Sequence, residues 1–190
     1  MILEGLVTTV NGAGGMHLAP MGPRMARDGA TFVLRPFPTS QTFHHLRRTR
    51  QGVLHVTDNV LLLAQAAIGQ SPAPACFPAT HVHGFVLQDA CRYMEFVVRE
   101  LDETQERMHL QCAVVHQATL RDYFGLNRAK HAVVEAAIVA TRLHLLPSTE
   151  VRADYQRYRV WVEKTGGPDE HAAFQMLTDY VERVLGGGAT

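Results

Sequence analysis

The chain has 190 residues, of which 46% are apolar and 19% charged, a balance typical of one folded domain with at most a modest appendage. Eighteen basic residues oppose eighteen acidic ones, so the bulk charge provides no attraction to nucleic acid or to an anionic membrane. The longest apolar run, near 59–68, is far shorter than the roughly 20 residues that a membrane-spanning helix needs.

The first half of the chain predicts β structure. Strands are expected at 2–10, 16–21, 31–34 and 53–56, and the AsnGlyAlaGlyGly segment at 11–15 predicts a turn between the first two. A short helix at 60–68 and a proline-rich loop follow. The segments 92–100 and 107–115 predict a hairpin, because apolar and polar residues alternate along the second of them. Several short strands with few helices favour a barrel or a sandwich.

From about residue 124 the pattern changes to helix. Apolar residues recur at helical spacing in three stretches, 132–143, 151–162 and 174–184. Pro147, the GlyGlyPro segment at 166–168 and the glycines at 186–188 end these stretches. The sequence therefore predicts an α+β, mainly β fold, with a β-barrel at 1–123 and a C-terminal helical subdomain at 124–190.

The segment at 32–43 predicts an anion site. A strand ends at Arg35, two prolines prevent a helix from starting early, and Thr39 and Ser40 are then suitable N-cap residues for a helix. The first turn of a helix has unsatisfied N–H groups and a positive dipole end, which attract a phosphate. The hydroxyl groups of Thr39, Ser40 and Thr42 and the guanidinium of Arg35 would add donors. A capped strand-to-helix junction is also common without any ligand, so both interpretations stay open.

Six segments, taken in order, resemble one known family. They are IleLeuGluGlyLeuValThrThr (2–9), HisLeuAlaProMetGlyPro (17–23), LeuArgProPhe with ThrSerGlnThr (34–42), GlyValLeuHisValThrAspAsnValLeuLeuLeuAla (52–64), AsnArgAlaLysHisAlaValValGluAlaAlaIleValAlaThrArgLeu (127–143) and ValGluLysThrGlyGlyPro (162–168). The chain resembles an uncharacterised, domain-of-unknown-function family of FMN-binding split-barrel flavoproteins, related to flavin reductases and pyridoxamine-phosphate oxidases. The resemblance implies a split β-barrel with a C-terminal helical appendage.

The same resemblance implies FMN bound at the interface of a homodimer. The phosphate would lie at the predicted anion site, and backbone groups of residues 19–22 would lie near the isoalloxazine ring. Relatives often carry Asn where this chain has His45, whose neutral ring can donate one hydrogen bond. Arg128 or Lys130 would reach the cofactor or substrate, unless both are solvated helix charges. The cofactor-binding residues are expected to be Ala19, Met21, Gly22, Arg35, Thr39, Ser40, Thr42, His45, Arg128 and Lys130.

The function that the resemblance implies is an oxidoreductase of flavin-reductase type. The flavin carries the redox chemistry, so no catalytic side chain is assigned. A nicotinamide donor is expected, or a pterin-type substrate, since the family is occasionally associated with one-carbon metabolism. An FMN carrier or sensor without turnover, and a barrel dimer that has lost its cofactor, remain as alternatives.

Other common sites are disfavoured. The sequence lacks GxSxG, GxxxxGK[ST] and HExxH motifs, and a strand rather than a helix follows the glycines at 11–15. His81 and His83 would face the same side of a strand, but their segment is predicted to be a loop without a carboxylate or cysteine at ligand spacing. No metal site is therefore predicted, and a loop histidine near the flavin is the alternative.

The three cysteines are scattered and form no CxxC pair, which indicates buried thiols in a reducing compartment. The N-terminal segment 1–10 lacks the basic flank and the small-residue cleavage site of a signal peptide. A cytoplasmic protein is expected, with neither nucleic acid nor membrane as a partner.

Overall fold

The computed structural model describes residues 1–187, which form two compact units. The first comprises Met1–Thr57 with Ala73–Tyr123, and the second comprises Asp58–Pro72 with 124–187. The predicted helical subdomain extends to residue 190, and its last three residues, with one glycine of its predicted stop, lie outside the described part. The apolar segment after Thr57 belongs with the C-terminal helices, because its helix packs against two of them.

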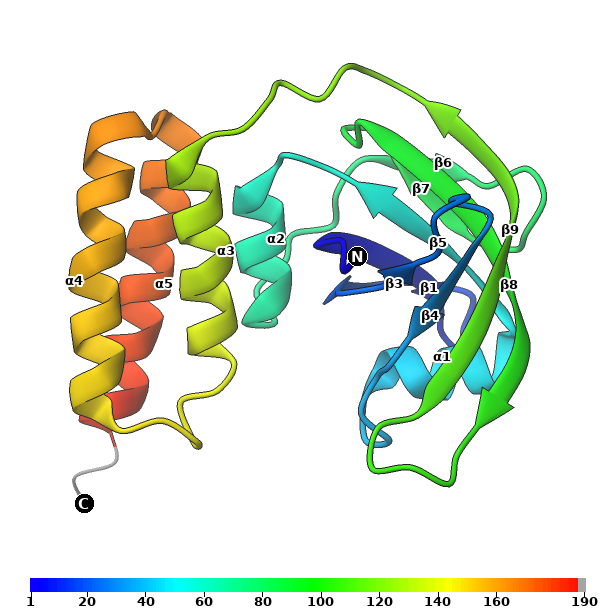
Figure 1. Cartoon of the computed structure of the whole chain (residues 1–190), viewed down its shortest axis with the longest axis horizontal. Coiled ribbons are helices and arrows are strands. Elements are labelled where there is room, and N and C mark those ends of the chain that lie inside the picture. Colours follow the sequence, from blue (N-terminus) through cyan, green and yellow to red (C-terminus); the bar gives the residue numbers. More distant parts are fainter. Residues whose placement is uncertain (188–190) are drawn as a thin grey trace. The chain divides into compact units, whose positions relative to one another are not determined.

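The first unit is built on a seven-stranded antiparallel sheet, which Figure 1 shows as strongly curled. The order of its strands is β2-β1-β5-β8-β9-β4-β3. The strands are β1 (Gly5–Val10), β2 (Met16–Met21), β3 (Arg24–Met25), β4 (Thr31–Leu34), β5 (Gln51–Val56), β8 (Arg92–Asp102) and β9 (His109–Thr119). Helix α1 (Gln41–Thr49) connects β4 to β5 and packs against β1, β2 and β5. The predicted mainly β fold is confirmed.

A second sheet lies where the sequence predicts only a proline-rich loop. It has two strands, β6 (Cys76–Pro78) and β7 (Phe85–Leu87), each three residues long. The prediction of a loop was wrong here because three residues are too few to show an alternating pattern. The prediction also ended the last long strand too early, since β9 continues to Thr119.

The two faces of the large sheet carry separate hydrophobic clusters. Met94, Phe96 and Val98 of β8 lie in the larger cluster, which includes Phe43 and Leu46 of α1. The neighbouring residues of β8 alternate to the other face, where a smaller cluster joins the large sheet to β6 and β7. One face of β8 therefore packs against α1, and the other face packs against the small sheet of β6 and β7.

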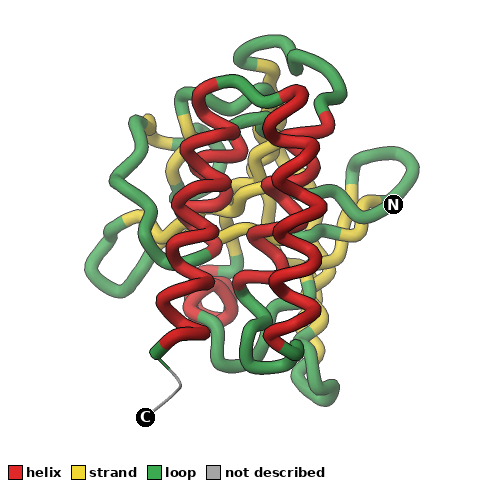
Figure 2. The backbone as a smooth tube through the Cα atoms, turned by 90° about the vertical axis from the view of Figure 1, so that its left-hand side faces the viewer, coloured by secondary structure: helices red, strands yellow, loops and turns green. Residues whose placement is uncertain are grey.

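The second unit is a bundle of four helices. They are α2 (Val60–Ala67), α3 (Arg128–Ala140), α4 (Ser148–Thr165) and α5 (Pro168–Gly186). Figures 1 and 2 show α4 and α5 side by side, and α3 packs against both. The hydroxyl of Tyr155 on α4 donates a hydrogen bond to the carbonyl of Ala136 on α3 at 2.8 Å, and its ring stacks on Phe174 of α5. Within residues 1–187, no helix is both long and apolar enough to cross a membrane.

Buried polar side chains fasten the small sheet to the large one. His55 of β5 is fully buried; its Nδ1 lies 3.2 Å from the carbonyl of Leu6, and its Nε2 accepts a hydrogen bond from the N–H of Leu87 at 3.1 Å. These partners require the neutral tautomer that carries its proton on Nδ1. Thr8 of β1 donates a second bond to the carbonyl of Phe85 at 2.6 Å. Burial lowers the pKa of His55 to about 4.

This histidine should make the protein less stable in mild acid. The unfolded chain binds a proton at His55 near pH 6.5, whereas the folded chain binds it only near pH 4. The unfolded state therefore holds more protons in this window, and the free energy of unfolding falls as the pH falls through it. The lowered pKa of His55 corresponds to a loss of roughly 3 kcal/mol in the free energy of unfolding across this pH window.

Urea unfolding at about pH 7 and about pH 4.5 measures this effect. In the His55→Gln variant the side chain keeps one donor and one acceptor but no longer titrates. The variant should lose less stability than the original protein between the two pH values. Equal losses in the two proteins would contradict the assignment.

Candidate functional site

The side chain of Arg35 contains a buried polar atom that has no hydrogen-bond partner within the described part of the chain. The residues on both sides are held by neighbouring chain, since Leu34 pairs with Leu110 of β9 and the carbonyl of Pro36 accepts a bond from the N–H of Met108 at 3.1 Å. Among the described residues, nothing accepts a hydrogen bond from the buried Nε of Arg35. A buried donor left unpaired costs about 1–3 kcal/mol. The position therefore favours an acceptor supplied from outside the chain.

Helix α1 begins a few residues after this arginine, at the second of the two cap residues that the sequence predicts, Thr39 and Ser40. Ser40 is the N-cap: its hydroxyl accepts a bond from the N–H of Phe43 at 3.2 Å and donates one to the carbonyl of Phe37 at 2.8 Å. The N–H groups of Gln41 and Thr42 remain in the first turn as donors for an anion. The helix start and the guanidinium thus offer donors from one short stretch of chain.

Two histidines lie where α1 packs against β1 and β2, His17 on β2 and His45 on α1 itself. His17 Nε2 on β2 lies 3.3 Å from the hydroxyl of Thr42, and His45 Nδ1 lies 3.0 Å from the hydroxyl of Thr9 on β1. The two rings meet edge to face at 5.0 Å. Burial lowers the pKa of His17, and burial with nearby basic groups lowers the pKa of His45. Both rings are therefore mainly neutral at neutral pH, and the guanidinium of Arg48 on α1 is a positive charge close to His45.

The residues expected near an aromatic ring lie on the edge strand β2. Ala19 and Met21 are half-buried, and Gly22 follows the strand as an exposed residue. β2 pairs with β1 on one side and is the terminal strand of the sheet. An edge strand presents backbone N–H and C=O groups that no neighbouring strand uses. These groups are available to a ligand or to a second chain.

The two predicted basic residues of the C-terminal part lie in the other unit. Arg128 is exposed at the first residue of α3. Lys130 is held within the helical bundle, with its Nζ 2.9 Å from Oε1 of Glu170 and 2.7 Å from the carbonyl of Asp58. Lys130 thus has two partners within its own unit. Arg35, Thr39, Ser40 and Thr42 lie within eight residues of chain around the start of α1.

Sequence reasoning missed three polar residues. His17 lies inside a matched segment, but no local pattern shows that an edge-strand histidine contacts a helix. Glu95 and His116 lie beside His81, because strand pairing joins positions distant in sequence. His83 lies outside this group, and its N–H bonds to the side chain of Gln51. The sequence predicts no metal site at His81 and His83, and in the structure it is His81 alone of the two that lies in a cluster, with Glu95 and His116.

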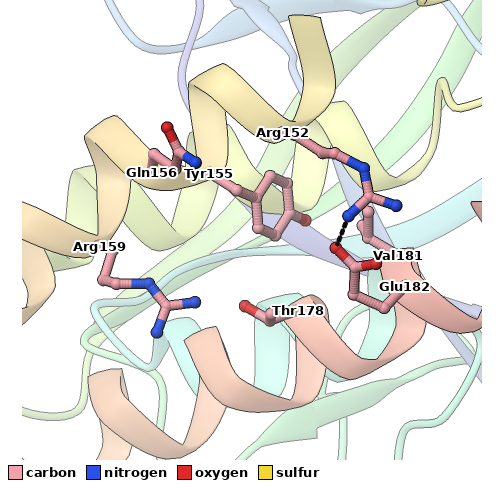
Figure 3. Close-up of a pocket in the computed structure, with 7 residues that line it drawn as sticks. All are labelled: Arg152, Tyr155, Gln156, Arg159, Thr178, Val181 and Glu182. Atoms are coloured by element: carbon pink, nitrogen blue, oxygen red, sulfur yellow. Dashed lines mark hydrogen bonds and ion pairs between the residues drawn. The ribbon is translucent and has the colours of Figure 1, made fainter. Parts of the chain in front are cut away.

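A pocket of about 160 Å³ lies between α4 and α5. Figure 3 shows Arg152 joined to Glu182 and the ring of Tyr155 between the two helices. Burial raises the pKa of Tyr155, whose hydroxyl already donates to the backbone of α3. Ligand pockets usually measure roughly 300–1,000 Å³. This pocket is therefore too small for a nucleotide cofactor.

The curled sheet with α1 packed on it is the split-barrel fold that FMN-binding proteins and flavin reductases share. Within this class, the chain belongs to the family described as "Protein of unknown function (DUF447)". The model of its N-terminal domain matches residues 3–121, and a second model matches residues 127–179. The family resemblance seen in the sequence is confirmed. No curated protein matches the chain.

Solved structures establish the same fold. The crystal structure of an FMN-bound DUF447 protein from Methanosarcina mazei has a TM-score of 0.80 at 20% identity and covers 94% of each chain. The flavin reductase HpaC, solved with NADP+, has a TM-score of 0.56 at 15% identity, covering 65% of this chain and 81% of its own. A 2-nitrobenzoate 2-nitroreductase from Pseudomonas fluorescens has a TM-score of 0.53 at 17% identity, and the match covers 61% of this chain and 64% of the nitroreductase chain.

Proposed function

We propose that this chain binds FMN, with the phosphate at Arg35 and the start of α1 and the isoalloxazine ring beside residues 19–22 of β2. The observation that carries the proposal is the buried Nε of Arg35, which has no partner among residues 1–187 and belongs to a residue five positions before the cap of α1. The split-barrel fold, shared with an FMN-bound member of the same family, gives independent support.

The residues present suit a phosphate in different ways. Arg35 supplies a charged donor, and the first turn of α1 supplies N–H groups at the positive end of its dipole. The hydroxyl of Thr39 is exposed and available as a further donor. The hydroxyls of Ser40 and Thr42 already have partners in the chain, so these residues shape the turn that presents the N–H groups.

The bound flavin would supply hydride and electron transfer. The role of the chain is to bind the phosphate, to orient the ring along β2 and to shield it from water. We propose turnover of flavin-reductase type, with a nicotinamide or pterin-type molecule as the reaction partner, because solved flavin reductases share the fold. An FMN carrier or sensor is the second candidate, because the buried Nε of Arg35 and the capped start of α1 support phosphate binding and do not themselves require turnover.

Replacing Arg35 should weaken FMN binding. The Arg35→Ala variant loses a charge-assisted hydrogen bond worth about 1.5–3 kcal/mol, or roughly 10- to 150-fold in Kd. Quenching of flavin fluorescence during titration of the purified protein measures the affinity. Arg47→Ala is the matched control, because Arg47 is an exposed arginine in the last turn of α1 that pairs with Glu103.

A pair of variants at Ser40 separates helix stability from phosphate binding. Both Asn and Asp are good N-cap residues, so Ser40→Asn and Ser40→Asp should unfold at similar urea concentrations. Only Ser40→Asp places a negative charge beside the phosphate, and it should bind FMN more weakly than Ser40→Asn. Equal affinity in these variants, together with an unchanged affinity in Arg35→Ala, would show that the phosphate binds elsewhere.

Anaerobic reduction distinguishes an enzyme from a carrier. An FMN-loaded reductase should lose its visible flavin absorption when NADH or NADPH is added without oxygen, because reduced flavin is nearly colourless. Dithionite serves as the positive control for reduction. Bleaching by dithionite but by neither nucleotide would exclude a nicotinamide-dependent reductase and favour the carrier or a different donor.

We also propose that the protein is a homodimer with FMN at the interface. The terminal position of β2 and the half-buried side chains along it support an interface there. Light scattering should give twice the chain mass of 21.1 kDa for the FMN-loaded protein. A monomer that holds FMN tightly would contradict the placement of the cofactor between chains.

A further inference from the structure

Glu95 and His116 face each other across the β8–β9 pair. They are direct partners in the register, and the next pair joins Phe96 to Val114, which leaves Val115 as the extra residue of a β-bulge. Directly opposed side chains lie on the same face, with Cβ atoms about 4.5–5.5 Å apart. A bulge re-aims the side chains beside it, and bulges are frequent next to functional sites. The pairing thus holds a carboxylate and an imidazole together.

Glu95 also fixes the loop between β6 and β7. Its carboxylate is fully buried and accepts hydrogen bonds from the N–H groups of three successive residues: Thr80 at 3.0 Å, His81 at 2.5 Å and Val82 at 3.0 Å. This anchoring places the ring of His81 over that of His116, with centroids 4.4 Å apart and planes 20° apart. His81 Nδ1 lies 3.9 Å from Glu95 Oε2.

We propose that His81, Glu95 and His116 bind a divalent transition-metal ion, with Zn²⁺ as the best match. One ligand atom from each residue lies within 4.8 Å of the other two. Tetrahedral zinc holds its ligands about 3.3 Å apart, so the atoms must approach each other by about 1–1.5 Å at most. His81 permits this movement because its side chain is half exposed. Two imidazoles and one carboxylate leave a fourth position for water, as in open zinc sites.

The surroundings suit a metal ligand set. The hydroxyl of Tyr93 lies 3.4 Å from Nε2 of His116, and outer-shell hydrogen bonds of this kind orient a metal-binding imidazole. The three N–H bonds account for the burial of Glu95, but they do not account for two histidines stacked beside its carboxylate. A shared metal ion accounts for the gathering of two imidazoles at this carboxylate.

This site is separate from the proposed phosphate site. Tyr93 belongs to the small cluster beneath β6 and β7, whereas Met94 and Phe96 belong to the large cluster that includes α1. Because successive residues of a strand point to opposite faces, Glu95 lies on the face of β8 away from α1. Metal binding can therefore be tested without flavin, and its failure would leave the FMN proposal intact.

The test is a titration of the full-length chain, freed of any affinity tag and stripped with EDTA. Calorimetry with ZnCl₂ should show saturable binding of about one equivalent per chain, and Co²⁺ should give the visible absorption of a tetrahedral site. His81→Ala and His116→Ala should each weaken Zn²⁺ binding by at least about 100-fold, because loss of an outer-shell partner alone costs roughly 10- to 100-fold. His83→Ala is the matched control from the same loop and should bind as the original chain does.

The Tyr93→Phe variant tests the hydrogen bond between the Tyr93 hydroxyl and His116, which would orient this imidazole toward the metal. It should weaken Zn²⁺ binding by about 10- to 100-fold while retaining the tetrahedral Co²⁺ spectrum. Circular dichroism checks that each variant is folded. The Co²⁺ spectrum of the unaltered chain tests the proposal even if a variant fails to fold. Absence of saturable binding in that chain, or equal binding when His81 and His116 are both replaced, would overturn the proposal and leave Glu95 as a structural anchor only.

Discussion

The pairing of β8 with β9 is the constraint on which the rest of the β-unit depends. β8 also pairs with β5, and β9 also pairs with β4, so this one pair joins the two halves of the sheet. Its register shifts at two points, and such bulges bend a strand and increase its twist. The resulting curl lets α1 leave the end of β4 and pack against β1 and β2 at the other end of the sheet. Because of this curl, the first turn of α1, which follows Arg35 in the chain, lies against His17 of β2.

Helix α1 owes its position to the core rather than to its own stability. It has nine residues, and isolated helices shorter than about 12–15 residues are marginal in water. Phe43 and Leu46 anchor it in the large cluster, and the cap at Ser40 fixes where it begins. The N–H groups of its first turn are therefore held in place before any ligand arrives, which lowers the entropy cost of binding an anion.

The features that the sequence predicts correctly have strong local signals. The strand before Arg35, the cap at Ser40 and the C-terminal helices all follow from turn residues, capping residues or periodicity. The remainder depends on contacts that are distant in sequence. The apolar pattern of α2 indicates a helix but not that α3 and α5 cover it. The predicted strand ended at Val115, one residue before His116, so its register with Glu95 could not be foreseen.

Buried polar residues occur on the face of the large sheet that packs against β6 and β7, and one physical reason explains all of them. Two strands of three residues bury too little apolar surface to hold a sheet in one position, so directional hydrogen bonds must do so. Thr8, His55 and Glu95 provide them, each from a different strand of the large sheet. A buried polar group that loses its partner is costly, so any displacement of the small sheet is opposed at several points. The same bonds hold the backbone of His81 at a fixed place beside His116, and a rigid support of this kind is what a ligand site requires.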